Sequence, residues 1–442
     1  MSDVDDETQM EEARLERVVR HFRKGQLGND AAWGTLHDIC QLFVQTASFL
    51  LLGRRLGVED YGRYAGVYGV VGPIGGLTWS GVTLAVLQRR LRERDSVRQT
   101  ARDFFGYTIA LGVCAVGIGT LIAGQIIGGL AITTIAAVMV AELFCNAVNQ
   151  VSISMVQAEH GFAAATRLKM IILAIRVGVL LALVAMDSLT IAHLAIGFSV
   201  GFTVYTVALF RVILPAFGIR VELAPPSQGI FKVTGSISLP IAAGVLQQDG
   251  DKAVLNAYGF QHDAGLYAAA FRVVSMGLMP LRALEGAAFQ RFLPHDENAR
   301  NEHTRRAFRF SILALSGSVV VGIGVLVFAP LLDFLIGEDF AGAEAMIPWL
   351  LPFLPLTAIA NAPSNGLLGL GRLGNRAAIY FGGASISLTS YIVFVPIFAE
   401  PWKGAVLGTI LGEAFLVVAG WMTLLHFQRR HNRSLEVIDV ST

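Results

Sequence analysis

The sequence is poor in charged residues, cysteine and lysine. Only 15% of its 442 residues are charged, whereas soluble domains carry about 25%. With 54% hydrophobic residues the chain is also far too apolar to be intrinsically disordered. Its formal net charge of +1 provides no basic surface for nucleic acid. These absences exclude a soluble domain, a disordered chain and a nucleic-acid-binding protein.

Motifs for cofactors and catalysis are missing as well. None of the five lysines follows a glycine, which excludes a Walker A motif and ATP hydrolysis. The three cysteines all lie in apolar stretches and predict packing residues, not a disulfide framework. A G-x-G-x-x-G occurs at residues 369–374, but it joins two apolar helices, so we interpret it as a tight loop. We therefore expect no enzyme, no bound cofactor and no metal.

The sequence contains instead repeated apolar runs of about 20 residues, the length that crosses a bilayer as a helix. They predict an all-α polytopic membrane protein with about twelve transmembrane helices. The predicted spans cover residues 31–52, 64–87, 104–124, 131–156, 168–186, 190–213, 229–249, 264–288, 308–330, 344–370, 376–398 and 404–426.

Basic residues are distributed unequally between the two sides of these spans. If the N-terminus is cytoplasmic, 26 Lys and Arg lie in or beside the inner segments, and only five lie in outer loops. The five include Lys252, just after the seventh span. The positive-inside rule then predicts that both termini are cytoplasmic.

An internal repeat divides the chain into two halves. Asp60-Tyr61-Gly62-Arg63-Tyr64-Ala65 matches Asp263-Ala264-Gly265-Leu266-Tyr267-Ala268, and each copy opens an equivalent span. The offset covers six spans, so the halves share one orientation and predict two parallel six-helix lobes. We expect an N-terminal tail at 1–30, an N-lobe at 31–221, a C-lobe at 222–428 and a C-terminal tail at 429–442.

Residues 56–65 resemble a known family. Leu-Gly-Val-Glu-Asp-Tyr-Gly-Arg-Tyr-Ala is similar to the pattern L-G-x-x-x-Y-G-x-Y/F-A of Wzx-type polysaccharide-biosynthesis flippases in the multidrug/oligosaccharidyl-lipid/polysaccharide (MOP) exporter superfamily. The second copy departs from the pattern, because Ala264 stands where the first has Tyr61. The resemblance implies that an undecaprenyl-diphosphate-linked oligosaccharide is moved from the inner to the outer leaflet of a bacterial plasma membrane by alternating access. It also implies membrane lipids, a polysaccharide polymerase and glycosyltransferases as partners.

Charged residues inside the spans are the first candidates for a substrate cavity, because an ionised group at membrane depth needs a partner or water. Arg272 and Arg176 have no acid within a turn of their own helices, and a guanidinium suits a diphosphate. Arg282 and Glu285 are three residues apart, so a local ion pair competes with a cavity role. Within the resemblance, Arg272 and Arg282 are the positions that match the cationic cavity wall of such flippases.

Amide-rich helical faces are the second group of candidates, because sugar hydroxyls need both donors and acceptors. Bonding between helices explains such faces equally well. Three of the acidic residues in the spans, Asp38, Glu142 and Glu413, are also candidates for H⁺ or Na⁺ coupling. The remaining candidates for the cavity are Asp38, Gln41, Gln45, Glu142, Asn146, Asn149, Asn361 and Asn365.

A second function stays open beside the flippase. A multidrug-and-toxin-extrusion (MATE) antiporter of drugs or metabolites, driven by a cation, would share the predicted fold. A membrane glycosyltransferase is disfavoured, because the loops are too short to carry a catalytic carboxylate pair in a folded domain.

Overall fold

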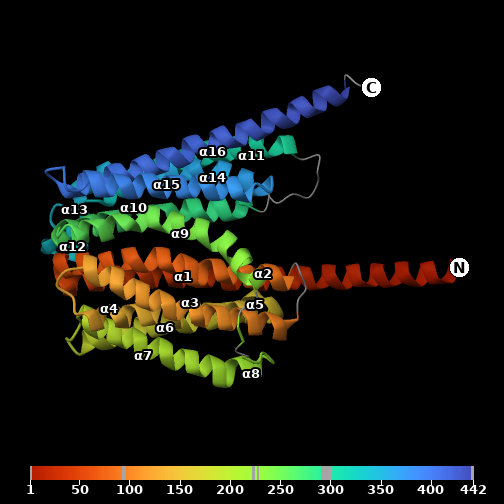
Figure 1. Cartoon of the computed structure of the whole chain (residues 1–442), viewed down its shortest axis with the longest axis horizontal. Helices are drawn as coiled ribbons and strands as arrows, with labels where there is room; N and C mark the ends of the chain where they lie inside the picture. The colour runs from red at the N-terminus through yellow and green to blue at the C-terminus, as the bar shows by residue number, and fades with distance from the viewer. Residues whose placement is uncertain (1, 92–95, 222–223, 226–227, 290–299, 440–442) are drawn as a thin grey trace.

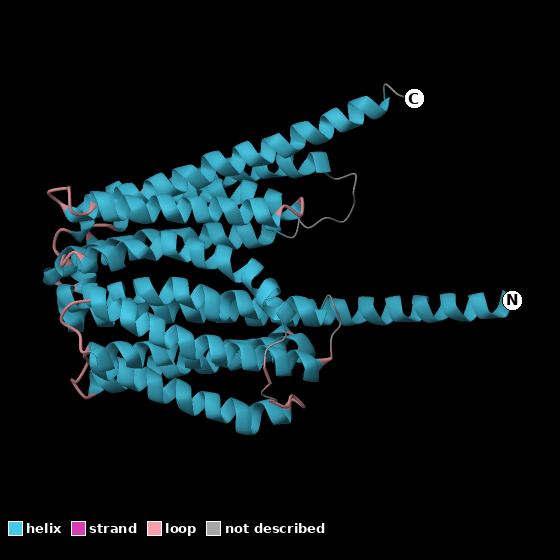
Figure 2. Cartoon of the chain, viewed as in Figure 1, coloured by secondary structure: helices cyan, strands magenta, loops and turns pink. Residues whose placement is uncertain are grey.

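The computed structural model describes the backbone of residues 2–91, 96–221, 224–225, 228–289 and 300–439. Within these ranges, side chains are not described for residues 2–29, 31, 91, 97, 228, 282–289, 300–304, 306, 333 and 429–439. The described part consists of helices joined by short loops, without a strand (Figure 2). The predicted all-α class is therefore confirmed.

The helices follow one another along the whole chain. In chain order they are α1 (Ser2–Gly75), the π-helix η1 (Gly76–Ser80), α2 (Gly81–Leu91), α3 (Val97–Ile126), α4 (Ile132–Met139), the π-helix η2 (Val140–Cys145), α5 (Asn146–His160), α6 (Phe162–Ala185), α7 (Ile191–Ala208), the π-helix η3 (Leu209–Ile213), α8 (Leu214–Ala216), α9 (Gln228–Ala257), α10 (Gln261–Phe289), α11 (Arg300–Phe328), α12 (Leu331–Ile336), the 3₁₀ helix η5 (Glu338–Phe340), α13 (Ala343–Leu350), α14 (Phe353–Gly369), α15 (Leu373–Phe394) and α16 (Pro401–Asp439).

Among the described residues, 11 helices are long and apolar enough to cross a membrane. The first of these extends over 59 residues, from Ala32 to Arg90. A straight helix of that length would measure about 90 Å, roughly three times the hydrocarbon core. Gly57 breaks it, because its φ of 72° lies outside the helical region and is open to glycine. The stretch therefore forms two spans, the first ending before Gly57 and the second covering residues 58–91, which agrees with the twelve predicted.

The helices form two groups that lie side by side (Figure 1). Helices α1 to α8, red to yellow-green, make up the first half, and α9 to α16, green to blue, make up the second. Helix α1 begins and α16 ends at the same end of the bundle. We call the opposite end, where the chain turns at Gly57, Gly259 and Gly337, the far end.

The two halves meet along the second span and α9. An added Cβ at Gly69 would lie only 2.6 Å from the carbonyl oxygen of Asp249, so the two backbones are in direct contact there. Small residues allow this close approach between membrane helices. Asn256 of α9 connects the halves further, because its Nδ2 donates a hydrogen bond to the Gly62 carbonyl oxygen at 2.9 Å.

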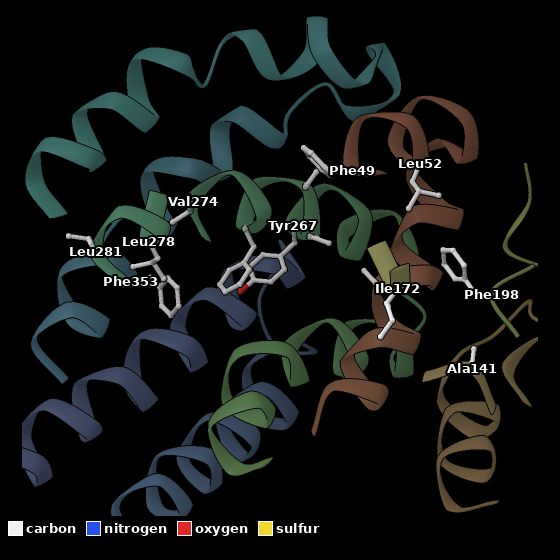
Figure 3. Close-up of a cluster of buried hydrophobic side chains, with 14 of the residues drawn as sticks. Phe49, Leu52, Ala141, Ile172, Phe198, Tyr267, Val274, Leu278, Leu281 and Phe353 are labelled. Carbon is white, nitrogen blue, oxygen red and sulfur yellow. The ribbon is translucent and has the colours of Figure 1, made fainter. Parts of the chain in front are cut away.

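Buried hydrophobic side chains from both halves fill the space around this contact (Figure 3). Phe49 and Leu52 come from α1, while Val274 and Leu278 come from α10. On the outside of the bundle large apolar side chains are exposed, such as Phe334 at 78%. Apolar side chains suit a surface that faces lipid, where every polar group must be satisfied internally.

Candidate functional site

A large cavity lies between the two halves. Its volume is about 760 Å³, and the helices around it are α1, η1, η2, α5, α6, α7, α9 and α10. Apolar and aromatic side chains form much of its wall, among them Tyr61, Tyr64, Tyr68, Trp79 and Phe198. The polar side chains on the wall are His37, Gln41, Gln45, Ser48, Glu142, Asn146, Gln150, Lys169, Arg176, Gln248, Asp249, Lys252, Arg272 and Ser275.

Arg272 lies on the cavity wall at the middle of α10. Its side chain is half-buried, and no carboxylate among the described residues forms an ion pair or a hydrogen bond with its guanidinium. The backbone carbonyl of Arg272 accepts a hydrogen bond from Ser275 Oγ at 2.9 Å. An unneutralised cation in a confined, partly apolar cavity attracts anions strongly, because the local dielectric constant is low.

Arg176 also lines the cavity, but it is neutralised. Its Nη2 lies 2.7 Å from Glu142 Oε2, and Tyr68 donates a hydrogen bond to the other carboxylate oxygen at 2.8 Å. The guanidinium also lies over the rings of Phe198 and Phe202, at 5.4 and 5.1 Å from their centroids. Glu142 is only 4% exposed, so this interhelical ion pair satisfies a deeply buried carboxylate.

Lys252 is a cavity residue that the sequence reasoning missed. Its Nζ lies 2.9 Å from Asp249 Oδ1 and 3.1 Å from Asp251 Oδ1, and it donates to the Gln248 carbonyl at 2.8 Å. The ammonium group also lies 4.1 Å from the centroid of the Phe271 ring. Asp249 and Lys252 are three residues apart on one helix face, and this spacing is the signal that could have revealed the ion pair.

The prediction that Lys252 belongs to an outer loop is therefore wrong. The predicted seventh span ends at residue 249, whereas α9 continues to Ala257. Nothing between these positions breaks a helix, since the first residue with positive φ is Gly259. The polar residues after position 248 suggested a loop, but their mutual ion pairs and the cavity allow them to stay in the helix.

Of the predicted amide residues, Gln41, Gln45 and Asn146 line the cavity, and Asn149 does not. Gln41 and Gln45 lie on α1, and Asn146 begins α5. Asn149 is fully buried, and its Oδ1 accepts a hydrogen bond from Thr206 of α7 at 2.8 Å. It therefore serves the helix–helix contact that was the alternative interpretation of these residues.

Three other candidates lie away from the cavity wall. Asp38 has a side chain that is 82% exposed, and it lies 3.3 Å from His37 Nδ1. Asn361 and Asn365 are on α14 in the second half and do not line the cavity. Arg282 and Glu285 belong to α10, but their side chains lie outside the described residues.

The second half has a further polar cluster inside its own helices. Asp251, which is fully buried, accepts a hydrogen bond from the Tyr267 hydroxyl at 2.6 Å. Glu413 of α16 is 2% exposed and accepts from Gln247 Nε2 at 3.2 Å. No group of three or more His, Cys, Asp or Glu able to hold a metal occurs in the part of the chain that the structure describes.

The charges on the cavity wall are unbalanced. Among the described residues of the wall, Lys169, Arg176, Lys252 and Arg272 contribute four cations, and two carboxylates, Glu142 and Asp249, lie with them. The two carboxylates pair with Arg176 and Lys252. The cavity can thus accept an anion, and its amides and hydroxyls can bind a polyhydroxylated molecule.

Comparison with known proteins identifies related chains and folds. The model of a family described as "polysaccharide biosynthesis protein" matches residues 51–284, more than half of the chain. None of the curated proteins compared with it gives a significant match.

Solved structures show the same fold at low sequence identity. An inward-facing multidrug resistance MATE transporter of the MOP superfamily is 16% identical with a TM-score of 0.67, covering 88% of this chain and 96% of its own. An outward-facing structure of such a transporter is 17% identical with a TM-score of 0.60, covering 91% and 97%. A MOP superfamily transporter from Pyrococcus furiosus, described as having a binding pocket of reverse polarity that suggests a different function, is 14% identical with a TM-score of 0.58, covering 90% and 94%.

Proposed function

Since the chain belongs to the polysaccharide biosynthesis protein family, we propose that it is a flippase for an undecaprenyl-diphosphate-linked oligosaccharide. It is a multi-pass membrane protein with the MOP transporter fold, and its cavity lies between two groups of helices. In this proposal the 31–221 and 222–428 lobes rock against each other and expose the cavity to either side in turn.

The observation that supports this proposal best is Arg272 on the cavity wall, which has no carboxylate partner among the described residues. Arg176 and Lys252 already have carboxylate partners, so of the cavity arginines whose side chains are described, Arg272 is the one available to an incoming anion. Its guanidinium can donate two parallel hydrogen bonds to a diphosphate. The amides of Gln41 and Asn146 on the same wall suit sugar hydroxyls.

The orientation is part of the proposal. The excess of basic residues beside the inner segments supports cytoplasmic termini in a bacterial plasma membrane. The far end of the bundle then faces the outside, and substrate enters from the inner leaflet. Glycosyltransferases that build the sugar and a polymerase that consumes it are the partners this direction requires.

The experiment compares Arg272→Ala with wild type in a flippase-deficient strain. We expect the variant to lose complementation and to bind undecaprenyl diphosphate about 10- to 100-fold more weakly, the loss typical of a charge-assisted hydrogen bond. Arg272→Lys should restore complementation and binding only in part. A lysine ammonium is a single point charge and cannot donate the two parallel hydrogen bonds of a guanidinium. The yield and melting temperature of the purified protein should stay near wild type.

The control is Arg211→Ala, which removes an exposed arginine on η3 outside the cavity wall. It should complement fully. A fully active Arg272→Ala protein would refute the assigned role. The alternative, a MATE-type antiporter with the same fold, would be favoured by a different result. Deleting the gene would then leave transport of undecaprenyl-diphosphate-linked sugar normal and make the cells more sensitive to drugs.

A further inference from the structure

The two copies of the repeated motif meet each other at the far end of the bundle. An added Cβ at Gly62 would overlap the carbonyl oxygen of Gln261, and one at Gly265 would overlap that of Val58. Gly62 and Gly265 are equivalent in the repeat, 203 residues apart, and so are Val58 and Gln261. Each copy thus presses its glycine against the backbone of the other, and the crossing is reciprocal.

A short segment of the second half covers this crossing. Helix α12 and η5, which connect α11 to α13, contact the end of the first span. Ile336 and Phe340 are fully buried, and Phe340 lies 5.7 Å from Tyr61 in an edge-to-face arrangement. Ile336 fits against Gly53, where an added Cβ would lie 3.6 Å from its own Cβ.

Arg54 fastens the covering segment to the first half. Its Nε donates to the Leu335 carbonyl oxygen at 2.7 Å and its Nη2 to the Phe334 carbonyl oxygen at 3.0 Å. These carbonyls belong to the last turn of α12, where they have no partner within the helix. A cation at the C-terminal end of a helix is also favoured by the helix dipole.

We infer that the repeated motif is the outer gate of the cavity, closed here by the reciprocal Gly62–Gly265 crossing and latched by Arg54 on α12. The inference rests on the proposed alternating access. Tyr61 lines the cavity on one side and contacts Phe340 on the other, so the gate is the end wall of the cavity. Opening toward the far end requires both the crossing and the Arg54 latch to separate.

The geometry explains why glycine stands at both crossing positions. Any side chain there would collide with a carbonyl of the other copy, so the backbones could not meet and the wall could not close. The position at which the second copy departs from the family pattern, Ala264 in place of Tyr61, has a role as well. Tyr61 reaches Phe340 of the covering segment, and the small Ala264 is fully buried.

A disulfide across the gate tests the inference directly. Gly53→Cys with Ile336→Cys places the Cβ atoms at 3.6 Å, within the range that a disulfide needs. Both changes are made in a protein whose three native cysteines are replaced by alanine, with Ser275→Cys on the cavity wall as reporter. Labelling by an impermeant maleimide is measured in right-side-out and inside-out membranes, and labelled peptides are identified by mass spectrometry.

We expect oxidation to reduce labelling of the reporter from the outer side at least tenfold, and reduction to restore it. Labelling from the inner side should not change. The matched control is Val179→Cys with Gly197→Cys, whose Cβ atoms lie at 3.7 Å within the first half, and its disulfide should leave both sides unchanged. Undiminished outer labelling after complete cross-linking, or failure of the gate pair to cross-link in folded protein, would overturn the inference.

A single substitution provides a second test that is independent of disulfide formation. Arg54→Ala removes the latch and should raise outer labelling of the reporter severalfold. Arg55→Ala is the control, because Arg55 pairs with Asp187 within the first half. Equal labelling of both variants would count against the latch. All these readouts report accessibility without substrate, so they stay interpretable even if the chain transports a different molecule.

Discussion

The second span and α10 are equivalent in the repeat, yet they face the interface between the halves in different ways. Where the second span has glycines, α10 has larger residues 203 positions later. The equivalent pairs are Gly69 and Arg272, Gly72 and Ser275, and Gly76 and Met279. The glycines lie against α9, where Gly69 and Gly72 also border the cavity, and the three residues of α10 line the cavity.

This difference shows how a duplicated chain can form a closed contact on one edge and a cavity on the other. Glycine lets two helix backbones touch, as at Gly69 and Asp249. Arg272 and Met279 are too large for such a contact, and Arg272 needs a polar surrounding as well. The crossing at Gly62 and Gly265 is the place where both copies kept glycine and where both edges close.

The largest expected effect comes from a bulky residue at the direct backbone contact between the second span and α9. In Gly69→Leu the Cβ would lie 2.6 Å from the Asp249 carbonyl oxygen and 3.0 Å from the Ala253 nitrogen, both backbone atoms that a rotamer change cannot move. Overpacking typically destabilises by about 1–3 kcal/mol, and a collision with two backbone atoms that cannot move aside should exceed that range. We expect little folded protein by size-exclusion chromatography and a strongly lowered melting temperature.

The matched change on α10, at a position that lines the cavity, is Ser275→Leu. It introduces the same side chain on the cavity wall, where there is room for it. We expect its melting temperature to stay close to wild type. Equal destabilisation by the two leucines would show that the glycines of the second span are not what holds the halves together.

The sequence predicted the fold well, because apolar runs and the positions of polar turns are local properties. It predicted the two halves and about twelve spans, which agrees with the 11 candidate helices once the first is divided at Gly57. The assignment to a polysaccharide-biosynthesis family also held, since the motif carries it within one short stretch. Boundaries were weaker where polar residues continue a helix, as at Lys252 in α9.

The site was only partly predictable, because it depends on contacts between distant helices. Arg176 and Glu142 are 34 residues apart, and no local spacing indicates that they pair. Asp38 and Gln41 are three residues apart, a spacing that predicts one shared polar face, yet of these two only Gln41 reaches the cavity. Which part of a helical face turns to the cavity is set by neighbouring helices, so periodicity alone leaves it open.

An intermediate effect is expected from the paired cation of the first half. Arg176→Ala leaves Glu142 buried with the Tyr68 hydroxyl as its remaining donor among the described residues. Removing one partner of a buried pair typically costs about 3–5 kcal/mol, and the lower end applies because the Arg176 side chain is 26% exposed. Chemical or thermal unfolding of the purified protein measures this loss, which Arg272→Ala should not show.

A double variant separates the pair from the cavity. Arg176→Met with Glu142→Gln removes both charges, and it should recover most of the stability lost in Arg176→Ala, because no buried carboxylate is left without a cation. If the double variant is as unstable as the single one, packing of the guanidinium against Phe198 and Phe202 explains the loss better than charge does.

The smallest effect concerns two neighbours on α1 that the structure separates. Asp38→Asn changes a side chain that is 82% exposed and away from the cavity, so complementation should stay within about twofold of wild type. Gln41→Ala removes an amide from the cavity wall and should weaken complementation more, by a factor corresponding to about 1 kcal/mol for one neutral hydrogen bond. A quantitative growth or surface-polysaccharide assay resolves this difference. A stronger loss from Asp38→Asn than from Gln41→Ala would mean that the charge of Asp38, outside the cavity wall, matters more than a hydrogen bond from the wall itself.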